Sequence, residues 1–166
     1  MARNKEIEID TRLGRRSVDA DKVVHFPRGL AGFENERDFI LLQIRPEAPL
    51  LILQSMNNPV VGLLVADPYS FMEKGAYAPA MGEAEKQLLR ISCLDEAAVL
   101  VTVAIPAGQP GEAALNLAGP IVINSRERIG LQVPQCTDGP QQIYMHSLKP
   151  VDENGQAEKS ETAPAE

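Results

Sequence analysis

Short apolar segments rich in β-branched residues recur along this chain, and Pro or Gly flanks most of them. The clearest are DFILLQI (38–44), LLILQS (50–55), VVGLLVAD (60–67) and AAVLVTVAIP (97–106). Segments of this length with such flanks are typical of strands rather than of buried helices. None approaches the roughly 20 apolar residues that a membrane-spanning helix needs, so we expect no membrane segment.

The stretch LNLAGPIVINSRERIGLQV (115–133) predicts a β-hairpin with a polar turn at 124–127. In its second strand, Ile129, Leu131 and Val133 alternate with polar or small residues and share one face. The segment GEAEKQLLRI (82–91) predicts one short helix, with Gly82 before its start and acidic residues in its first turn. Many short strands and one helix predict an all-β protein, specifically a small closed or roll-like β-barrel.

The composition changes after Lys149. Residues 151–166 carry five acids, one base and a single apolar residue larger than Ala. Such a segment buries too little surface to offset its ordering entropy, so we predict a disordered acidic tail at 151–166. The length before it suits a single domain over 1–150.

The chain carries 23 acidic and 16 basic residues, for a formal net charge of −7. This charge repels phosphate backbones and anionic lipid, so we expect no direct nucleic-acid binding and no membrane association. The N-terminus MARNKEIEID lacks the apolar core of a signal peptide. Two cysteines do not make a disulfide framework, which predicts a cytoplasmic protein with reduced thiols.

Catalytic and metal motifs are weak. The candidate metal ligands His25, His146, Cys93 and Cys136 lack the close spacing of a zinc site. No nucleophile elbow surrounds any serine. We therefore predict no enzyme activity, no metal and no cofactor. The segment GLAGFE (29–34) lacks the spacing of a phosphate loop and predicts a compact turn, with glycines at positive φ and Phe33 in the core.

One segment combines aromatic residues and methionine with few charges, as the core of a protein interface does. The predicted partner-binding residues in it, with the nearby acids, are Tyr69, Phe71, Met72, Tyr77, Met81, Glu73, Glu83 and Glu85. The same composition also suits residues that close one end of a barrel, and the sequence leaves both interpretations open.

These segments together resemble the flagellar assembly factor FliW family. The matching pieces are FPRGLAGFE (26–34), PLLILQS (49–55), VVGLLVADPYSF (60–71) and LNLAGPIVINSRERIGLQV (115–133). They occur in the family's order, and the resemblance as a whole spans about Ile7 to Leu148. Ala31 stands where the family usually has Pro, Gly119 where it has Ala, and the closing IYMHSLK is less basic than usual.

The resemblance implies a β-barrel-like protein that binds flagellin in the cytoplasm. It also implies binding to CsrA, an RNA-binding repressor, and so relief of the repression of flagellin mRNA translation. Neither role needs a small-molecule substrate. The alternative is a small-ligand-binding or enzymatic β-barrel with a pocket at its mouth near Tyr69, Phe71 and Tyr77.

Overall fold

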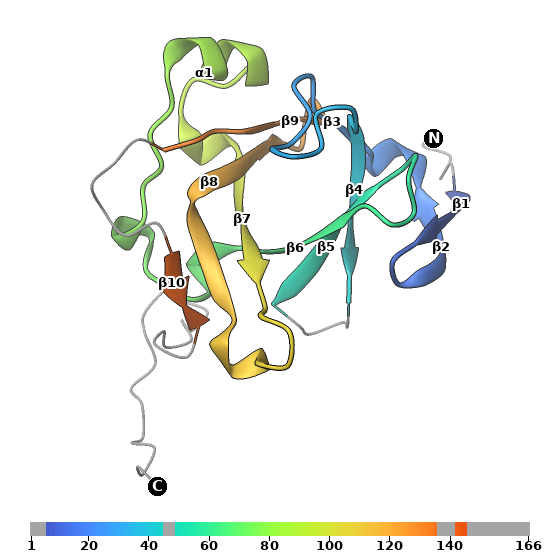
Figure 1. Cartoon of the computed structure of the whole chain (residues 1–166). Helices are drawn as coiled ribbons and strands as arrows, with labels where there is room; N and C mark the ends of the chain where they lie inside the picture. The colour runs from blue at the N-terminus through green and yellow to red at the C-terminus, as the bar shows by residue number, and fades with distance from the viewer. Residues whose placement is uncertain (1–5, 45–48, 136–141, 146–166) are drawn as a thin grey trace, which may run out of the picture.

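A closed ring of strands forms the body of the protein (Figure 1). The computed structural model describes residues 6–44, 49–135 and 142–145. The seven strands of the ring are β3 (Val24–His25), β4 (Asp38–Gln43), β5 (Leu50–Ser55), β6 (Gly62–Ala66), β7 (Ala98–Ala104), β8 (Ala114–Asn124) and β9 (Ile129–Gln132). Each pairs antiparallel with its neighbour except β3 and β9, which are parallel and close the ring. The predicted all-β class and closed barrel are confirmed.

In the described part of the chain, three strands, one α-helix and several short 3₁₀ turns lie outside the ring. Strand β10 (Gln142–Tyr144) pairs with the first part of β8, and β1 (Glu6–Thr11) and β2 (Gly14–Asp19) form a separate hairpin. Helix α1 (Glu83–Leu89) is the predicted helix, and the backbone N–H of Gly82 donates to Glu85 Oε1 at 2.7 Å at its start. Short 3₁₀ turns occupy 20–22, 68–70, 74–76, 94–96 and 110–112. Among the described residues, no helix has the length and apolar character needed to cross a membrane.

The sequence did not predict β2 or β10. The segment GRRSVD of β2 has only one apolar residue, and β10 has three residues. Both strands depend on a partner strand rather than on their own patterning. The predicted tail at 151–166 lies outside the described residues.

A bulge in β8 divides this strand between two faces of the barrel wall. Leu100 of β7 pairs with Ile121, whereas Thr102 pairs with Asn116, so β8 has three extra residues at this point. An odd number of extra residues reverses which side chains face inward. Ile121 accordingly lies in the barrel interior, and Leu115 lies in a cluster on the outside.

Side chains fill the barrel interior. Phe26 and Phe39 are fully buried there, with ring centroids 5.4 Å apart in an edge-to-face arrangement. Around them lie Val24, Leu30, Leu53, Val61, Val65, Leu100, Ile121 and Ile123. The turn at 29–34 closes over this core as predicted, because Gly29 and Gly32 have φ of 65° and 84° and Phe33 packs against the core.

Two apolar clusters lie on the outside of the ring. The first, called the outer cluster, contains Ala66, Val101, Val103, Ala113, Leu115 and Leu117. The second, called the helix cluster, contains Leu89, Ile91, Val122, Leu131 and Val133. Ile129 packs against the helix cluster, so the predicted shared face of the β8–β9 hairpin is confirmed. On the opposite face, a Cβ at Gly130 would lie 2.5 Å from the Phe26 ring, so only Gly fits there.

The β1–β2 hairpin is anchored to the barrel wall through a buried glutamine. The backbone N–H of Arg12 donates to Gln54 Oε1 at 3.0 Å, and the Arg12 guanidinium donates to the Gly62 carbonyl at 2.7 Å. Gln54 is fully buried, although it lies in an apolar strand. Because a two-stranded hairpin is marginal alone, these contacts hold it in place.

Candidate functional site

The segment 67–82, called the strap here, carries most of the predicted partner-binding residues. It begins with a 3₁₀ turn at Pro68–Ser70, where Asp67 Oδ1 accepts the backbone N–H of Tyr69 at 2.9 Å. Asp at this position satisfies an N–H that the turn leaves unpaired, and Pro at the next position presets the backbone. The sequence DP therefore starts the strap at the end of β6.

Two tyrosines fix the path of the strap. The Tyr69 hydroxyl donates to the Tyr77 carbonyl at 2.9 Å, and the Tyr77 hydroxyl donates to the Leu117 carbonyl of β8 at 2.8 Å. Their ring centroids are 6.5 Å apart. Burial raises the pKa of Tyr77, and burial with the nearby Asp67 and Asp95 charges raises the pKa of Tyr69. Both hydroxyls therefore stay protonated as donors near neutral pH.

A glutamine side chain ties the far end of the strap to the barrel. Gln135 Oε1 accepts the backbone N–H of Ala80 at 2.7 Å, and Gln135 Nε2 donates to the Ala80 carbonyl at 3.0 Å. The Gln135 backbone N–H donates to the Ala118 carbonyl at 2.7 Å. The strap is thus hydrogen-bonded near both ends and presents a fixed surface.

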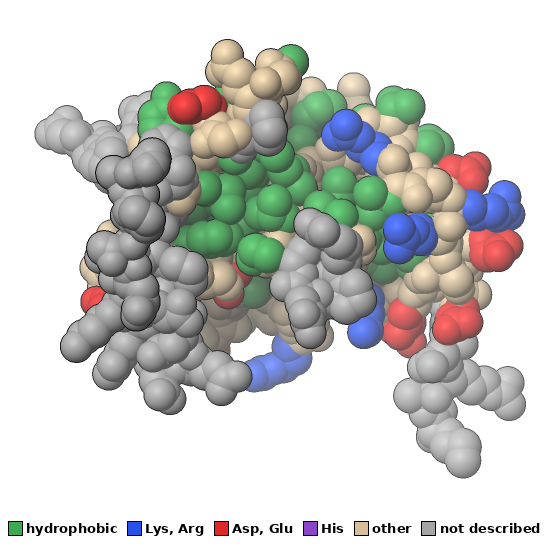
Figure 2. Space-filling model, turned by 90° about the horizontal axis from the view of Figure 1, so that it is seen from below, with side chains coloured by type: hydrophobic (Ala, Val, Ile, Leu, Met, Phe, Trp, Pro, Cys, Tyr) green, Lys and Arg blue, Asp and Glu red, His purple; other side chains and the backbone are tan. Residues whose placement is uncertain are grey.

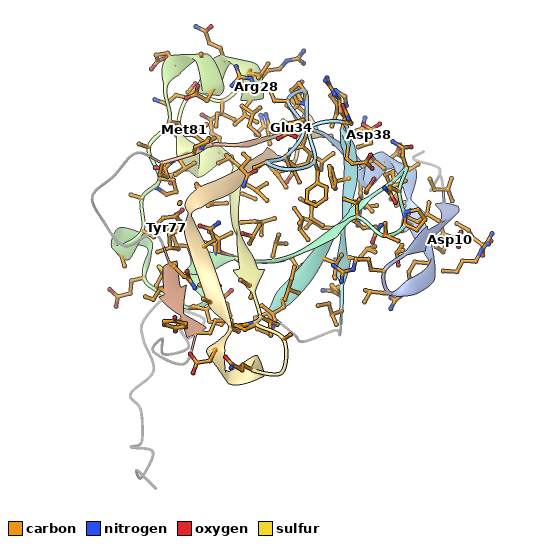
Figure 3. All side chains as sticks on the ribbon, in the orientation of Figure 1. Asp10, Arg28, Glu34, Asp38, Tyr77 and Met81 are labelled. Carbon is orange, nitrogen blue, oxygen red and sulfur yellow. The ribbon has the colours of Figure 1, made fainter. Side chains whose placement is uncertain are left out.

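The predicted apolar residues contribute to two different clusters. Phe71, Met72 and Tyr77 pack against the outer cluster, and Met81 packs against the helix cluster. All four are half-buried. Figure 3 shows Tyr77 and Met81 on the side of the barrel that carries α1, away from Asp10 on the β1–β2 hairpin. The strap therefore covers the barrel wall and also forms part of its surface.

The three predicted acids differ in what they do. Glu85 accepts the backbone N–H of Gly82 and so caps α1. Glu83 is exposed and lies 3.5 Å from Lys86 Nζ. Glu73 is exposed between the two 3₁₀ turns of the strap. Only Glu73 and Glu83 are placed to meet a partner without loss of a helix cap.

One face of the molecule is largely apolar (Figure 2). Figure 2 shows hydrophobic side chains gathered over the face of the molecule seen from below, with charged residues toward its borders. Half-buried Leu50 and Leu64 extend the outer cluster, and Ile105 is 45% exposed. An apolar surface with a polar border is typical of protein-binding sites.

Sequence reasoning missed a glutamine that joins two of the recognised motifs. Gln132 Oε1 accepts the backbone N–H of Ala31 at 2.8 Å, and Gln132 Nε2 donates to the Gly119 carbonyl at 3.0 Å. This side chain links the turn at 29–34 to the β8 bulge. A polar residue in the alternating pattern of a strand is expected to face solvent. The sequence therefore did not indicate that Gln132 joins these two segments.

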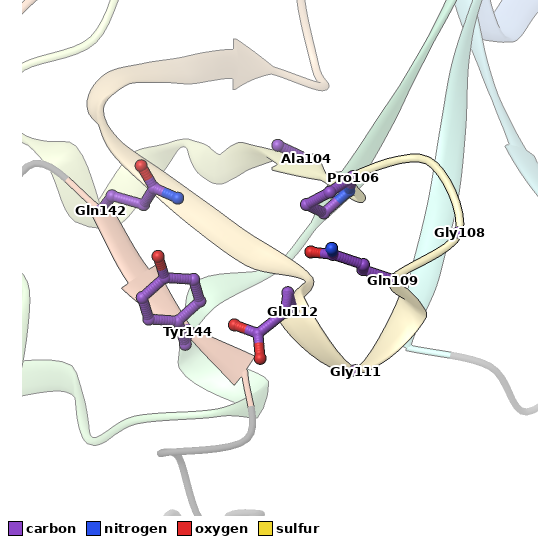
Figure 4. A pocket seen from close by; sticks show the side chains of 8 residues that line it. All are labelled: Ala104, Pro106, Gly108, Gln109, Gly111, Glu112, Gln142 and Tyr144. Atoms are coloured by element: carbon purple, nitrogen blue, oxygen red, sulfur yellow. The ribbon is translucent and has the colours of Figure 1, made fainter.

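The alternative function needed a pocket near Tyr69, Phe71 and Tyr77. One hollow of about 630 Å³ lies instead between the β7–β8 loop and β10 (Figure 4). It is open, and its lining includes Pro106, Gln109, Gln142 and Tyr144. A smaller hollow lies in the barrel wall beside β3. Neither is lined by the three residues that the alternative named.

Within residues 6–44, 49–135 and 142–145, no three His, Cys, Asp or Glu side chains gather in a way that suits a metal ion. Cys93 is exposed, and Cys136 and His146 lie outside the described residues. His25 Nδ1 lies 2.9 Å from Asp38 Oδ1 on neighbouring strands.

Known proteins share both the sequence and this architecture. The FliW protein family model matches residues 8–145. The chain belongs to the FliW family. A flagellar assembly factor FliW from Desulfovibrio desulfuricans (strain ATCC 27774 / DSM 6949 / MB) is 95% identical over the full length of both chains. One from Nitratidesulfovibrio vulgaris (strain DP4) is 59% identical over 148 residues, which cover 88% of this chain and 84% of that one.

A solved structure agrees with these relatives. The crystal structure of the flagellar assembly factor FliW superimposes with a TM-score of 0.75 at 30% identity, and covers 84% of this chain and 96% of that chain. The predicted resemblance to the FliW family is therefore confirmed. The four recognised FliW segments lie at the turn over the barrel core, on β5, at the start of the strap and on the β8–β9 hairpin.

Proposed function

We propose that this protein is a cytoplasmic, non-catalytic regulator that binds flagellin and CsrA through the strap and its border. Binding to CsrA relieves the repression of flagellin mRNA translation, and flagellin competes for the protein. Family membership supports the flagellar role. The fixed strap, with its apolar surface and exposed acids, supports protein binding.

The distribution of charge is the observation that supports weaker RNA binding by CsrA in the complex. Residues 67–96 contain six acids and three bases, so their net charge is −3. Residues 1–150 together also have a net charge of −3, so the remaining 120 residues of that domain are neutral overall. The acid excess of the domain thus lies on the strap and the helix region. Placed beside an RNA-binding groove, such a surface repels RNA.

The range of this repulsion is short. The Debye length is about 8 Å at physiological salt, so only acids close to the groove act on RNA. Exposed Glu73 and Glu83 are the candidates on the strap and at the start of α1. Repulsion of this kind weakens as the salt concentration rises, which provides a direct test.

Gel shifts of the flagellin leader RNA with CsrA, with and without this protein, test the proposal. The protein alone should not shift the RNA, and its complex with CsrA should bind RNA more weakly than free CsrA, most strongly at low salt. The double variant Glu73→Gln/Glu83→Gln should restore part of the RNA affinity and leave CsrA binding nearly unchanged. Asp10→Asn, on the β1–β2 hairpin, is the matched control and should behave as wild type.

Calorimetry locates the binding surface. Phe71→Ala and Met72→Ala, each shown to be folded by its thermal midpoint, should weaken binding of at least one partner by about 2 kcal/mol if they form a central hot spot. Folded variants that bind flagellin and CsrA as wild type does would place the surface elsewhere. Independent binding of RNA and this protein to CsrA at low salt would refute the repulsion mechanism.

A further inference from the structure

A hollow of about 360 Å³ lies in the barrel wall next to β3, on a different part of the molecule from the strap. Its floor is formed by Val24, Leu41 and Ile123, which all belong to the barrel core. Its mouth carries Asp21, Lys22 and Arg128. We call this hollow the seam site. Its size falls within the range of about 300–1,000 Å³ that is typical of small-molecule pockets.

The shortness of β3 creates the hollow. This strand has two residues and pairs with β4 only at Val24↔Phe39 and His25↔Asp38. Its pairing with β9 is limited to His25↔Ile129. Beyond Phe39, the edge of β4 therefore continues past the end of its partner strand, and the hollow lies in this gap against the buried Val24 and Ile123.

The seam site combines an apolar floor with a positive mouth. Lys22 and Arg128 contribute two positive charges and Asp21 one negative charge, whereas the chain as a whole has a net charge of −7. The Arg128 side chain is 50% exposed and lies 4.0 Å from the Asp21 carboxylate, so this contact is long. A local positive charge on an acidic protein favours an anionic ligand.

The backbone at Arg128 gives an independent indication of function. Arg128 has φ of 57° at the end of the β8–β9 turn, a conformation that favours Gly or Asn. Its backbone N–H donates to the Asn124 carbonyl at 2.7 Å, and its Nη1 donates to the Asp21 carbonyl at 2.9 Å. An Arg that occupies a strained position and is aimed across a hollow is a feature for which a functional explanation is warranted.

We propose that the seam site binds a small amphiphilic carboxylate. The alkyl chain lies against Val24, Leu41 and Ile123, and the carboxylate lies between Arg128 and Lys22. The Arg guanidinium suits a carboxylate because it donates two parallel hydrogen bonds. Carboxylate binding at the seam site is separate from the binding of flagellin or CsrA. The seam site is also not the mouth pocket that the alternative function required.

Decanoate is the test ligand, and decanol is its neutral counterpart. The full chain, labelled with ¹³C at Val, Leu and Ile methyl groups, is titrated with each below its aggregation concentration. Decanoate should produce saturable shifts at Val24, Leu41 and Ile123, and decanol should bind at least about tenfold more weakly because it lacks the charge.

Variants separate the roles of strain and binding. Arg128→Gly removes both the strain and the cation, so its thermal midpoint should equal or exceed that of wild type while decanoate binding falls about tenfold or more. Lys22→Gln should weaken binding without a change in the midpoint. Arg15→Gln, an exposed cation on the β1–β2 hairpin, is the control and should bind decanoate as wild type does.

Four results would overturn the proposal. These are the absence of saturable shifts at the floor residues, shifts spread over unrelated methyl groups, equal binding of decanol and decanoate, and unchanged decanoate binding by both Arg128→Gly and Lys22→Gln. A fifth would be equal weakening by Arg15→Gln, because it would show that positive charge anywhere on the protein attracts decanoate and that the seam site is not specific.

Discussion

Replacement of Gln54 should destabilise the barrel, because this side chain connects three parts of the fold. It is fully buried in β5, where its Oε1 accepts from the N–H of Arg12 and its Nε2 faces the carbonyls that follow. The four carbonyl oxygens within 3.1 to 3.3 Å of Nε2 belong to Ser55, Asn58, Pro59 and Val61. The β5–β6 loop and the β1–β2 hairpin are thus joined through one amide.

The loss of stability in Gln54→Leu can be worked out from the polar groups that lose a hydrogen-bond partner. The Asn58 and Val61 carbonyls also accept backbone N–H groups, so the loss falls mainly on the Arg12 N–H and on the Ser55 and Pro59 carbonyls. Each unsatisfied group costs about 1 kcal/mol, at the low end of the range for buried groups. The free energy of unfolding should fall by about 3 kcal/mol in total. The thermal midpoint should then fall by about 6–12 °C for a domain of this size.

Gln54→Glu tests the same contacts by replacing the NH₂ group that donates to the carbonyls with a carboxylate oxygen. A carboxylate turned toward carbonyl oxygens is repelled, so the pKa of this carboxyl in the folded variant should be raised above the unfolded value of about 4.3. Its protonated form then favours folding below that pH, and the stability is lost as the pH rises. Thermal melts from pH 4 to pH 7 should show a gap from wild type that widens with pH.

The control for this series is Gln87→Glu, which adds the same charge at an exposed position of α1. Its midpoint should stay close to that of wild type at every pH. If Gln54→Glu were as stable as wild type at pH 7, or if the gap were independent of pH, the role assigned to the Gln54 amide would be wrong.

Three further predictions concern the turn over the core, the strap and the tail. Ala31→Pro removes the N–H that donates to Gln132, so the midpoint should fall by about 2–4 °C, and an unchanged midpoint would contradict this. Burial raises the pKa of Tyr77, so its neutral form stabilises the fold below about pH 10 and this contribution is lost at higher pH. Melts from pH 8 to 11 should therefore show a steeper loss for wild type than for Tyr77→Phe, which also lacks the bond to Leu117. Truncation after Lys149 should change the midpoint by less than about 4 °C, and a larger drop would show that the acidic tail contributes to the fold.

Residues of the recognised FliW segments make close contacts and hydrogen bonds that stabilise the barrel. Gly29 approaches the backbone of Glu34 so closely that an added Cβ would lie 2.7 Å from it. The serine of the LQS segment, Ser55, donates to Glu36 at 2.5 Å and accepts the backbone N–H groups of Asn57 and Asn58. These residues therefore form the scaffold, and the strap forms the surface that it presents. Ala31 donates its backbone N–H to Gln132, which a Pro at this position could not do.

The sequence grouped the residues that we predict to bind a partner, but it did not separate their structural roles. Aromatic and Met enrichment identified the strap, but it could not separate residues that cover the barrel from residues that face solvent. The structure places Phe71, Met72 and Tyr77 in one cluster and Met81 in another. It also assigns Glu85 to a helix cap, whereas Glu73 is exposed. That these residues bind flagellin or CsrA stays a prediction.

The sequence by itself determined the local elements of this protein. Short β-branched segments, a capped amphipathic stretch and a polar turn placed β4 to β9 and α1, because these signals depend on residues near one another in the chain. Ring closure through His25, the reversal of faces in β8 and the seam site were decided only by the tertiary structure. Each of them depends on contacts between segments far apart in sequence. The role of a polar residue such as Gln54 depends on the groups that folding brings to it. These groups cannot be inferred from its neighbours in the chain.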